Sequence, residues 1–258
     1  MKKFIVSRDD QVYEAWPDLV QTIDGTLLCV FTECRHHADR TDSRLMLTRS
    51  TDCGRTWTPK IPLTEKAADK DHRLDCARIS RLPDHSLIIV CDYVVGDENT
   101  GSAEVWLWRG DEKGTRFEGP EVTPVKGIVP TKLTVTQTGR WLLGAHYYSQ
   151  KVNKLVQYVW FSDDQGQTWS ERITAAEDAR YNLCEGDIAV LPDNTLIMLL
   201  RENSGLGYDG MKVISHDNGE TWEGIYPLPL PGCHRPVSLL LPDGRCLITY
   251  RFMQGGKG

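Results

Sequence analysis

The sequence predicts an all-β protein, a β-propeller built from four-stranded blades. Two repeated turn motifs carry this prediction: one has the pattern S-x-D-x-G-x-T-W, and the other separates two short apolar runs. The third observation is their alternation along the 258 residues, which defines a unit of about 50–60 residues with four strands. Four strands per repeat is the pattern of a propeller blade.

The first motif, an Asp box, has three close copies. Asp164 lies 112 positions after Asp52 and 53 before Asp217. Because the first interval is about twice the second, a degenerate copy is expected between them, and residues 110–117 keep an Asp, a Gly and an aromatic residue. In a tight turn the Asp accepts backbone N–H groups, the Gly supplies positive φ and the Trp packs between sheets. We therefore expect a structural role for the Asp-box residues Asp52, Gly54, Trp57, Asp164, Gly166, Trp169, Asp217, Gly219 and Trp222.

The second motif predicts a strand, a tight turn and a second strand rich in Leu, Ile and Val. Its turns fall at residues 23–26, 82–86, 137–140, 191–195 and 241–245. Together the motifs predict one domain, 1–258, with blades at 12–60, 72–120, 128–172, 184–226 and, in part, 234–258. We expect a truncated propeller or a fragment of a longer one; a closed five-bladed ring whose last blade borrows the N-terminal strand is the alternative.

Helical periodicity is weak throughout, and only 64–73 and 175–180 could hold short helical turns. The net charge of −6 without a basic run argues against a nucleic-acid partner, but leaves room for a local basic pocket. No segment approaches the ~18 apolar residues of a membrane span, and the N-terminal apolar run is too short for a signal peptide. We expect a cytoplasmic protein without a membrane partner.

The eight cysteines form no CxxC pair, and several lie within apolar runs. Buried free thiols are therefore expected, with no metal and no cofactor. His36, His37, Asp39 and Asp42 cluster after a predicted strand, where a polar loop is favoured over a metal site.

The Asp boxes, the blade pattern and the segment 184–201, which begins Cys-Glu-Gly-Asp-Ile-Ala, resemble the sialidase superfamily over nearly the whole chain. The resemblance implies a six-bladed propeller in which three arginines bind the sugar carboxylate, a Tyr–Glu pair supplies the nucleophile and an Asp is the acid/base. It identifies Asp42, which follows Arg35, with the acid/base and Glu185 with the glutamate of the pair. Arg201 and Arg251 match two of the arginines.

Two features depart from this pattern. Ala15 stands where the family's early Arg is expected, within Glu-Ala-Trp-Pro at 14–17. The nucleophilic Tyr would lie in a sixth blade, which this chain does not contain. Strict sialidase activity is therefore not the favoured reading.

Counting from the second motif selects candidate site residues independently of the family. Equivalent positions in each blade should form rings around the propeller axis. Eight residues after each turn come Thr32, Asp92, His146, Arg201 and Arg251, and eight or nine before it come Trp16, Asp75, Pro130, Glu185 and Arg235. Charge at the ends of apolar strands is costly unless paired or solvated, which predicts a water-filled channel mouth. Salt bridges such as Glu185–Arg201 or Asp75–Arg78 are the structural alternative.

These arguments define the candidate site. The expected catalytic residues are Asp42, Glu185 and Asp75, and the expected substrate-binding residues are Arg35, Arg78, Arg201, Tyr208, His234, Arg235 and Arg251. Arginines bind carboxylates or vicinal oxygens in a bidentate manner, and paired carboxylates provide the acid and base of glycosidic cleavage. We expect a sialidase-like glycoside hydrolase acting on a polar or acidic sugar, with a carbohydrate or glycoconjugate as partner. The alternative is a non-catalytic carbohydrate-binding or scaffold propeller.

Overall fold

The computed structural model describes residues 3–67, 71–97 and 102–253, and divides into two compact units, Met1–Pro130 and Thr131–Gly258. Each unit is described by itself. The strands of unit 1 are β1 (Tyr13–Gln21), β2 (Leu27–Cys34), β3 (Arg44–Ser50), β4 (Ile61–Pro62), β5 (His72–Arg81), β6 (Leu87–Val95), β7 (Ser102–Gly110) and β8 (Phe117–Lys126). Those of unit 2 are β9 (Thr134–Val135), β10 (Trp141–Ser149), β11 (Lys154–Ser162), β12 (Ile173–Ala176), β13 (Leu183–Val190), β14 (Leu196–Glu202), β15 (Met211–Ser215), β16 (Glu223–Pro227), β17 (Cys233–Leu240) and β18 (Cys246–Phe252).

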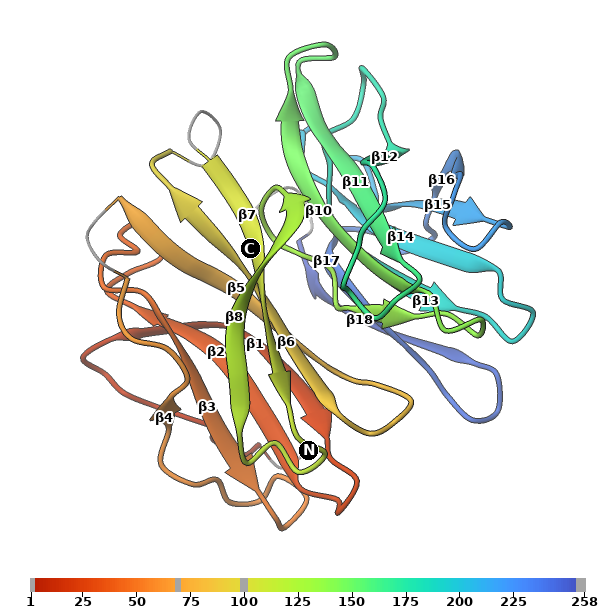
Figure 1. The fold of residues 1–258 in the computed structure, drawn as a ribbon. Coiled ribbons are helices and arrows are strands. Elements are labelled where there is room, and N and C mark those ends of the chain that lie inside the picture. The colour runs from red at the N-terminus through yellow and green to blue at the C-terminus, as the bar shows by residue number, and fades with distance from the viewer. Residues whose placement is uncertain (1–2, 68–70, 98–101, 254–258) are drawn as a thin grey trace. The chain divides into compact units, whose positions relative to one another are not determined.

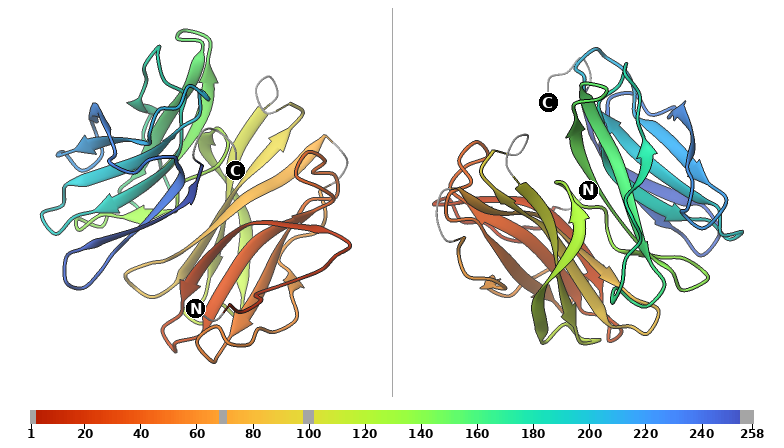
Figure 2. Two further views of the ribbon diagram at one scale, coloured as in Figure 1. Left: turned by 180° about the vertical axis from the view of Figure 1, so that it is seen from behind. Right: turned by 45° about the horizontal axis from the view of Figure 1, so that its top comes forward.

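Every sheet is an antiparallel meander in which consecutive strands pair (Figures 1 and 2). Unit 1 contains the sheets β1–β4 and β5–β8, and unit 2 contains β9–β12, β13–β16 and the pair β17–β18. The predicted all-β architecture of four-stranded blades, with four full blades and part of a fifth, is confirmed. The expected helical turns are wrong where they can be checked: residues 72–73 begin β5, 175–176 end β12, and no helix occurs in the described residues. Residues 68–70 lie outside them.

The first two strands of each blade are joined by the turn that the second motif predicted. In the turn before β6, Leu82 donates its N–H to the carbonyl of Ser86 at 2.9 Å. The equivalent bonds from Thr22, Thr136, Leu191 and Leu241 have the same length within 0.1 Å. A residue with positive φ follows in each turn, because only the left-handed region closes so tight a connection. The turns therefore set the register of each strand pair.

The Asp boxes connect the third and fourth strands, and their chemistry is structural as expected. Asp164 accepts the N–H and hydroxyl of Thr168 at 2.8 and 2.6 Å, and these bonds lower the carboxyl pKa to about 2. Asp111 accepts the same groups from Thr115, so the degenerate copy forms a comparable turn. Trp169 donates its indole N–H to the carbonyl of Gly166 at 3.1 Å, which ties the aromatic ring to its own turn.

The core lies between consecutive sheets of each unit. Strands buried on both faces read as nearly continuous apolar runs, as in β2, β6 and β10. In unit 1 the buried cluster joins both blades; its members include Leu28, Leu45, Leu74, Ile79, Leu87 and Trp108. In unit 2 it joins the blades of β10 and β13, and includes Leu142, Val159, Leu183, Leu196, Met198 and Val213. Stacked sheets thus hold the first strand of each blade beside that of the next, β1 beside β5 and β13 beside β17.

Buried aspartates reinforce this packing. Asp18 accepts the backbone N–H of Ile79 at 2.9 Å, across the two blades of unit 1. Asp187 accepts the N–H and hydroxyl of Ser238 at 2.7 and 2.6 Å, across two blades of unit 2. Each Asp lies two residues after the positive-φ residue of a bulge in its strand. The repeat therefore forms the same hydrogen bond between neighbouring blades twice.

Candidate functional site

A β-bulge interrupts the first strand of four blades, β1, β5, β13 and β17, and one residue of each bulge has φ near 50°. These residues are Trp16, Cys76, Glu185 and Arg235, and Val129, which precedes β9 in the third blade, has the same φ. Bulges re-aim side chains and are frequent beside functional sites. The ring of residues counted before each turn departs from these positions at two places. Asp75 precedes Cys76 by one residue, because it lies nine residues before Asp84 whereas Cys76 lies eight before it. Pro130 follows Val129 by one, because this blade has one residue more between Val129 and its turn.

The ring of residues that lies eight positions after each turn agrees with the structure. The residue before each bulge pairs with the ring residue of the second strand: Ala15 with Thr32, Asp75 with Asp92, Cys184 with Arg201 and His234 with Arg251. The strand register, and not the family, thus places the charged residues at equivalent points.

In unit 2, Glu185 and Arg201 form the centre of a charged cluster. Arg201 Nη1 lies 2.8 Å from Glu185 Oε1, with the side chains 16% and 14% exposed. Arg201 Nη2 also donates to Asn203 at 2.6 Å. Among the described residues, neither Glu185 Oε2 nor Arg201 Nε has a hydrogen-bond partner, although both atoms are buried. The ion pair that stood as the structural alternative therefore exists, and it leaves one acceptor and one donor for a ligand.

His146 contacts the backbone of Glu185 in this pair. Its Nδ1 accepts the backbone N–H of Glu185 at 3.2 Å, and its side chain is buried. Burial lowers the pKa of His146 to about 4, and the charges of Arg201 and Arg235 act in the same direction. The imidazole is therefore neutral near pH 7 and holds the Glu185 bulge through a ring nitrogen that must stay unprotonated.

Three arginines, Arg201, Arg235 and Arg251, share this cluster with the carboxylates of Glu185 and Glu202. Burial acts to raise the pKa of Glu185, but Arg201 and Arg235 prevail and the pKa is lowered. Arg251, on the exposed face of β18, lies 3.5 Å from Nδ1 of His234. Desolvation, Arg201 and Arg251 together lower the pKa of His234. The cluster thus carries more positive than negative charge, which suits an anionic group.

Tyr208 lies on the Gly-rich loop that follows β14, at the same end of the sheet as Arg201. Its ring packs edge-on against Tyr181 with centroids 5.0 Å apart, and 45% of Tyr208 is exposed. Asn203, which begins the loop, donates its N–H to the carbonyl of Asn182. The predicted aromatic residue is therefore held by packing and presents a face to solvent.

In unit 1 the charged cluster is centred on Asp75, which is fully buried. Arg40 Nη1 lies 2.8 Å from its Oδ2, and Arg73 Nε lies 3.6 Å from the same atom. Asp92, its cross-strand neighbour, accepts the backbone N–H of Val129 at 3.1 Å. Burial and the adjacent Asp75 charge raise the pKa of Asp92. Asp75 is thus paired with Arg40 and Arg73.

The remaining candidates have different surroundings. Arg35 Nη2 lies 3.1 Å from Asp42 Oδ2 in the loop after β2, with both side chains well exposed. Arg78 is buried, and its Nε donates to the carbonyl of Pro130 at 3.4 Å. His36 and Asp39 close a two-bond backbone turn. No cluster of three or more potential metal ligands occurs in 3–67, 71–97 and 102–253.

Counting along the repeat missed Arg40 and Arg73. Arg40 lies in a loop, where no strand periodicity marks a position. Arg73 could have been found, because it precedes Asp75 by two residues and side chains at i and i+2 share one face of a strand.

The fold and the two clusters define a class: a propeller-type Asp-box protein with charged residues at the bulges of its first strands. The chain belongs to the BNR repeat-like domain family, whose model matches residues 25–254. All eight cysteines are free. The part of the chain that the structure describes contains no helix long and apolar enough to cross a membrane.

Among curated proteins, the chain is 25% identical over 257 residues to a sialidase of Clostridium perfringens, covering 93% of this chain and 56% of that protein. It therefore spans about half the length of such relatives. Among solved structures it resembles a Dyadobacter fermentans protein of unknown function (TM-score 0.80, 20% identity, 97% of this chain and 78% of that one). It also resembles the Hadza microbial sialidase (TM-score 0.70, 16% identity, 91% and 52%). These likenesses support the sialidase-like propeller superfamily.

Proposed function

We propose that this protein is a sialidase-like glycoside hydrolase acting on a sugar with an acidic or strongly polar head group. The observation that carries the proposal is the Glu185–Arg201 pair, placed by a strand bulge and joined by a surplus of arginine charge. The sugar-active relatives support the reaction class.

The acidic head group would bind in unit 2. Arg201, Arg235 and Arg251 supply guanidinium groups that bind a carboxylate in a bidentate manner. Ala15, which is buried, supplies no such group. The substrate is therefore an acidic sugar that need not be a sialic acid.

Hydrolysis breaks the bond between the anomeric carbon and the leaving oxygen, which must receive a proton while water adds to the carbon. The resemblance to sialidases makes Asp42 the acid/base candidate, and this residue lies on an exposed loop of unit 1, where a proton can be exchanged with water. Glu185, whose pKa is lowered, stays ionised and acts as the negative group of the site. Asp75 supports the loop through Arg40.

The test is hydrolysis of aryl glycosides, including the sialoside, the glucuronide and neutral sugars, by the 258-residue protein. Glu185→Gln is compared with Glu223→Gln, which removes an exposed carboxylate on β16 of the same unit. Turnover lost in the first variant and retained in the second supports the proposal. Turnover equal in both variants would remove Glu185 from the mechanism.

A non-catalytic carbohydrate-binding propeller is the second candidate, favoured by Ala15 and by the pairing of Asp42 with Arg35. It predicts no turnover of any glycoside by folded protein, together with saturable binding of an acidic sugar that Arg201→Met weakens. Calorimetric titration with sodium glucuronate and N-acetylneuraminate measures this binding, and the hydrolysis assay separates the two functions.

A further inference from the structure

His234 and Arg251 lie opposite each other in unit 2, near the start of β17 and the end of β18. His234 occupies the position before the bulge of its strand, which Ala15, Asp75 and Cys184 occupy in three other blades. His234 is half-buried and Arg251 is exposed. The register therefore places a titratable side chain beside an arginine that a ligand can reach.

The contact between these two side chains requires a neutral histidine. Arg251 Nη2 lies 3.5 Å from Nδ1 of His234. A guanidinium group only donates hydrogen bonds, so Nδ1 of His234 is the acceptor and carries no proton. Within residues 3–67, 71–97 and 102–253, Arg251 has no other side-chain hydrogen bond or ion pair. Protonation of His234 would therefore break this contact and place two cations side by side.

The charges that act on His234 come from three neighbouring strands, β13, β14 and β18. Desolvation lowers the pKa of His234, and Arg201 and Arg251 lower it further. Glu185 and Glu202 oppose this shift without cancelling it. The neutral imidazole is therefore favoured as long as no further negative charge is present.

The other charged or titratable groups around this site keep one charge state near neutral pH. Arg235 follows His234 in the bulge, and Asp209 of the loop after β14 accepts a backbone N–H just before β17 at 3.3 Å. Burial lowers the pKa of His146 to about 4, and the pKa of Glu185 is lowered in spite of its burial. Between pH 5.5 and pH 7.5, His146 therefore stays largely neutral and Glu185 stays largely ionised.

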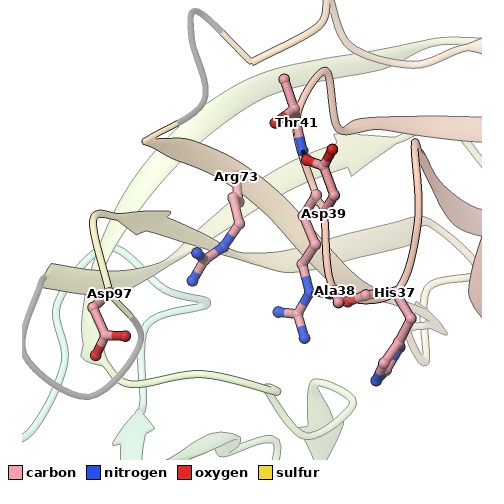
Figure 3. Close-up of a pocket in the computed structure, with 7 residues that line it drawn as sticks. His37, Ala38, Asp39, Thr41, Arg73 and Asp97 are labelled. Atoms are coloured by element: carbon pink, nitrogen blue, oxygen red, sulfur yellow. Dashed lines mark hydrogen bonds between the residues drawn. The ribbon is translucent and has the colours of Figure 1, made fainter.

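The pocket beside the loop after β2 in unit 1 has a different charge balance (Figure 3). Arg40 and Arg73 line it, but Asp39 and Asp97 line it as well. The same two arginines lie beside the buried Asp75. An anion would meet no surplus of positive charge there, so anion binding linked to a proton is expected in unit 2.

We propose that His234 takes up a proton when an acidic head group binds at Arg251. A carboxylate between the two side chains accepts hydrogen bonds from both, which compensates the repulsion between a protonated histidine and an arginine. Because each event favours the other, the affinity for the acid rises as the pH falls. The inference rests on the proposed function, which supplies the acidic head group, but it concerns binding and needs no turnover.

The experiment is calorimetric titration of the 258-residue protein with sodium N-acetylneuraminate and sodium glucuronate at pH 5.5, 6.5 and 7.5. Both probes are free acids that stay ionised over this range and contain no glycosidic bond. At pH 6.5, two buffers that differ in ionisation enthalpy report the number of protons taken up. His234→Gln and His234→Asn are the test variants, because an amide can accept from Arg251 without ionising. His216→Gln, which removes an exposed histidine of the same unit, is the matched control.

The wild type and His216→Gln are expected to bind at least one acid about tenfold more tightly at pH 5.5 than at pH 7.5, with uptake of a fraction of one proton. In His234→Gln the affinity should change less than about twofold over this range, without proton uptake. His234→Asn gives the same test where His234→Gln does not fold. Wild-type binding that is independent of pH, proton uptake that both His234 variants retain, or absence of saturable binding of either acid would overturn the proposal.

The hydrolysis assay separates this inference from the proposed function. Turnover of glycosides, together with acid binding that is independent of pH, would keep the hydrolase and remove the role of His234. Binding linked to a proton, without turnover of any glycoside, would refute the hydrolase and keep His234 as a binding residue.

Discussion

Glu185 Oε1 lies 2.8 Å from Arg201 Nη1, an ion pair that joins a strand bulge to the neighbouring strand of the same sheet. Both side chains are largely removed from solvent, so removal of one partner leaves the other charge poorly compensated. This relationship yields a prediction for stability that is separate from catalysis.

Arg201→Met is expected to destabilise the protein by about 3 kcal/mol at pH 7, because the Glu185 carboxylate loses its closest charge partner. Urea unfolding measures the change. The double variant Glu185→Gln/Arg201→Met should recover a substantial part of the loss, since no uncompensated charge remains. Strictly additive effects of the two substitutions would mean that the pair is not coupled.

The stability of the protein should depend on pH through His146. Its pKa is about 4 in the folded protein and about 6.5 in the unfolded chain, so the unfolded state binds more protons between these values. Stability is therefore complete above about pH 6.5 and falls as the pH decreases toward 4. The loss between pH 7 and pH 5 is on the order of 2 kcal/mol.

His146→Gln isolates this contribution, because the amide cannot ionise and its oxygen can still accept the Glu185 N–H. Thermal unfolding of both proteins at pH 7 and pH 5 measures the difference. The variant should lose less stability on acidification than the wild type; equal losses would show that His146 does not titrate in this range.

Asp92→Asn should have the opposite pH dependence. The pKa of Asp92 is raised in the folded state by burial and by Asp75, so the folded protein holds a proton that the unfolded chain releases above about pH 4. The associated stability is present at low pH and is lost as the pH rises through the raised pKa. Asparagine resembles the protonated carboxyl and can still accept the N–H of Val129.

The variant should therefore gain stability relative to the wild type between pH 5 and pH 8, measured by urea unfolding. A difference that stays constant over this range would place the ionisation of Asp92 outside it.

Gly219→Ala is expected to destabilise the protein more than Gly139→Ala. Both glycines have φ close to +90°, so each substitution brings backbone strain of about 1 kcal/mol. A Cβ at Gly219 would also lie 2.7 Å from Cδ2 of Leu142, whereas a Cβ at Gly139 meets no described atom within 4 Å. The added overpacking costs about 1–3 kcal/mol, which appears as a lower Tm. Equal melting temperatures would contradict the clash.

Much of the fold could be predicted because its signals are local. The turns near Asp24, Asp193 and Asp243, and the Asp boxes near Asp52 and Asp164, depend on residues within five positions of one another. The ring of residues eight positions after each turn was also predictable, because the number of residues from a turn along a regular strand fixes the strand register.

The site was harder to predict at the bulges and in the loops. Asp75 lies nine residues before Asp84, whereas the positive-φ residue Cys76 lies eight before it, and the sequence carries no signal that separates these two positions. The partner of Asp75 is Arg40, 35 positions earlier in a loop, and no strand period links the two. The roles of Asp42, Glu185 and the arginines remain predictions.

The sequence by itself determined the repeat, the order of the strands and the chemical types of residue at the strand ends, because turn geometry and strand alternation are set by neighbouring residues. Only the tertiary structure decided which charges pair. Arg201 lies against Glu185, while Arg40 and Arg73 share Asp75. The physical reason is that an ion pair depends on distance in space and on burial, and both arise only when the strands pair and the blades pack together.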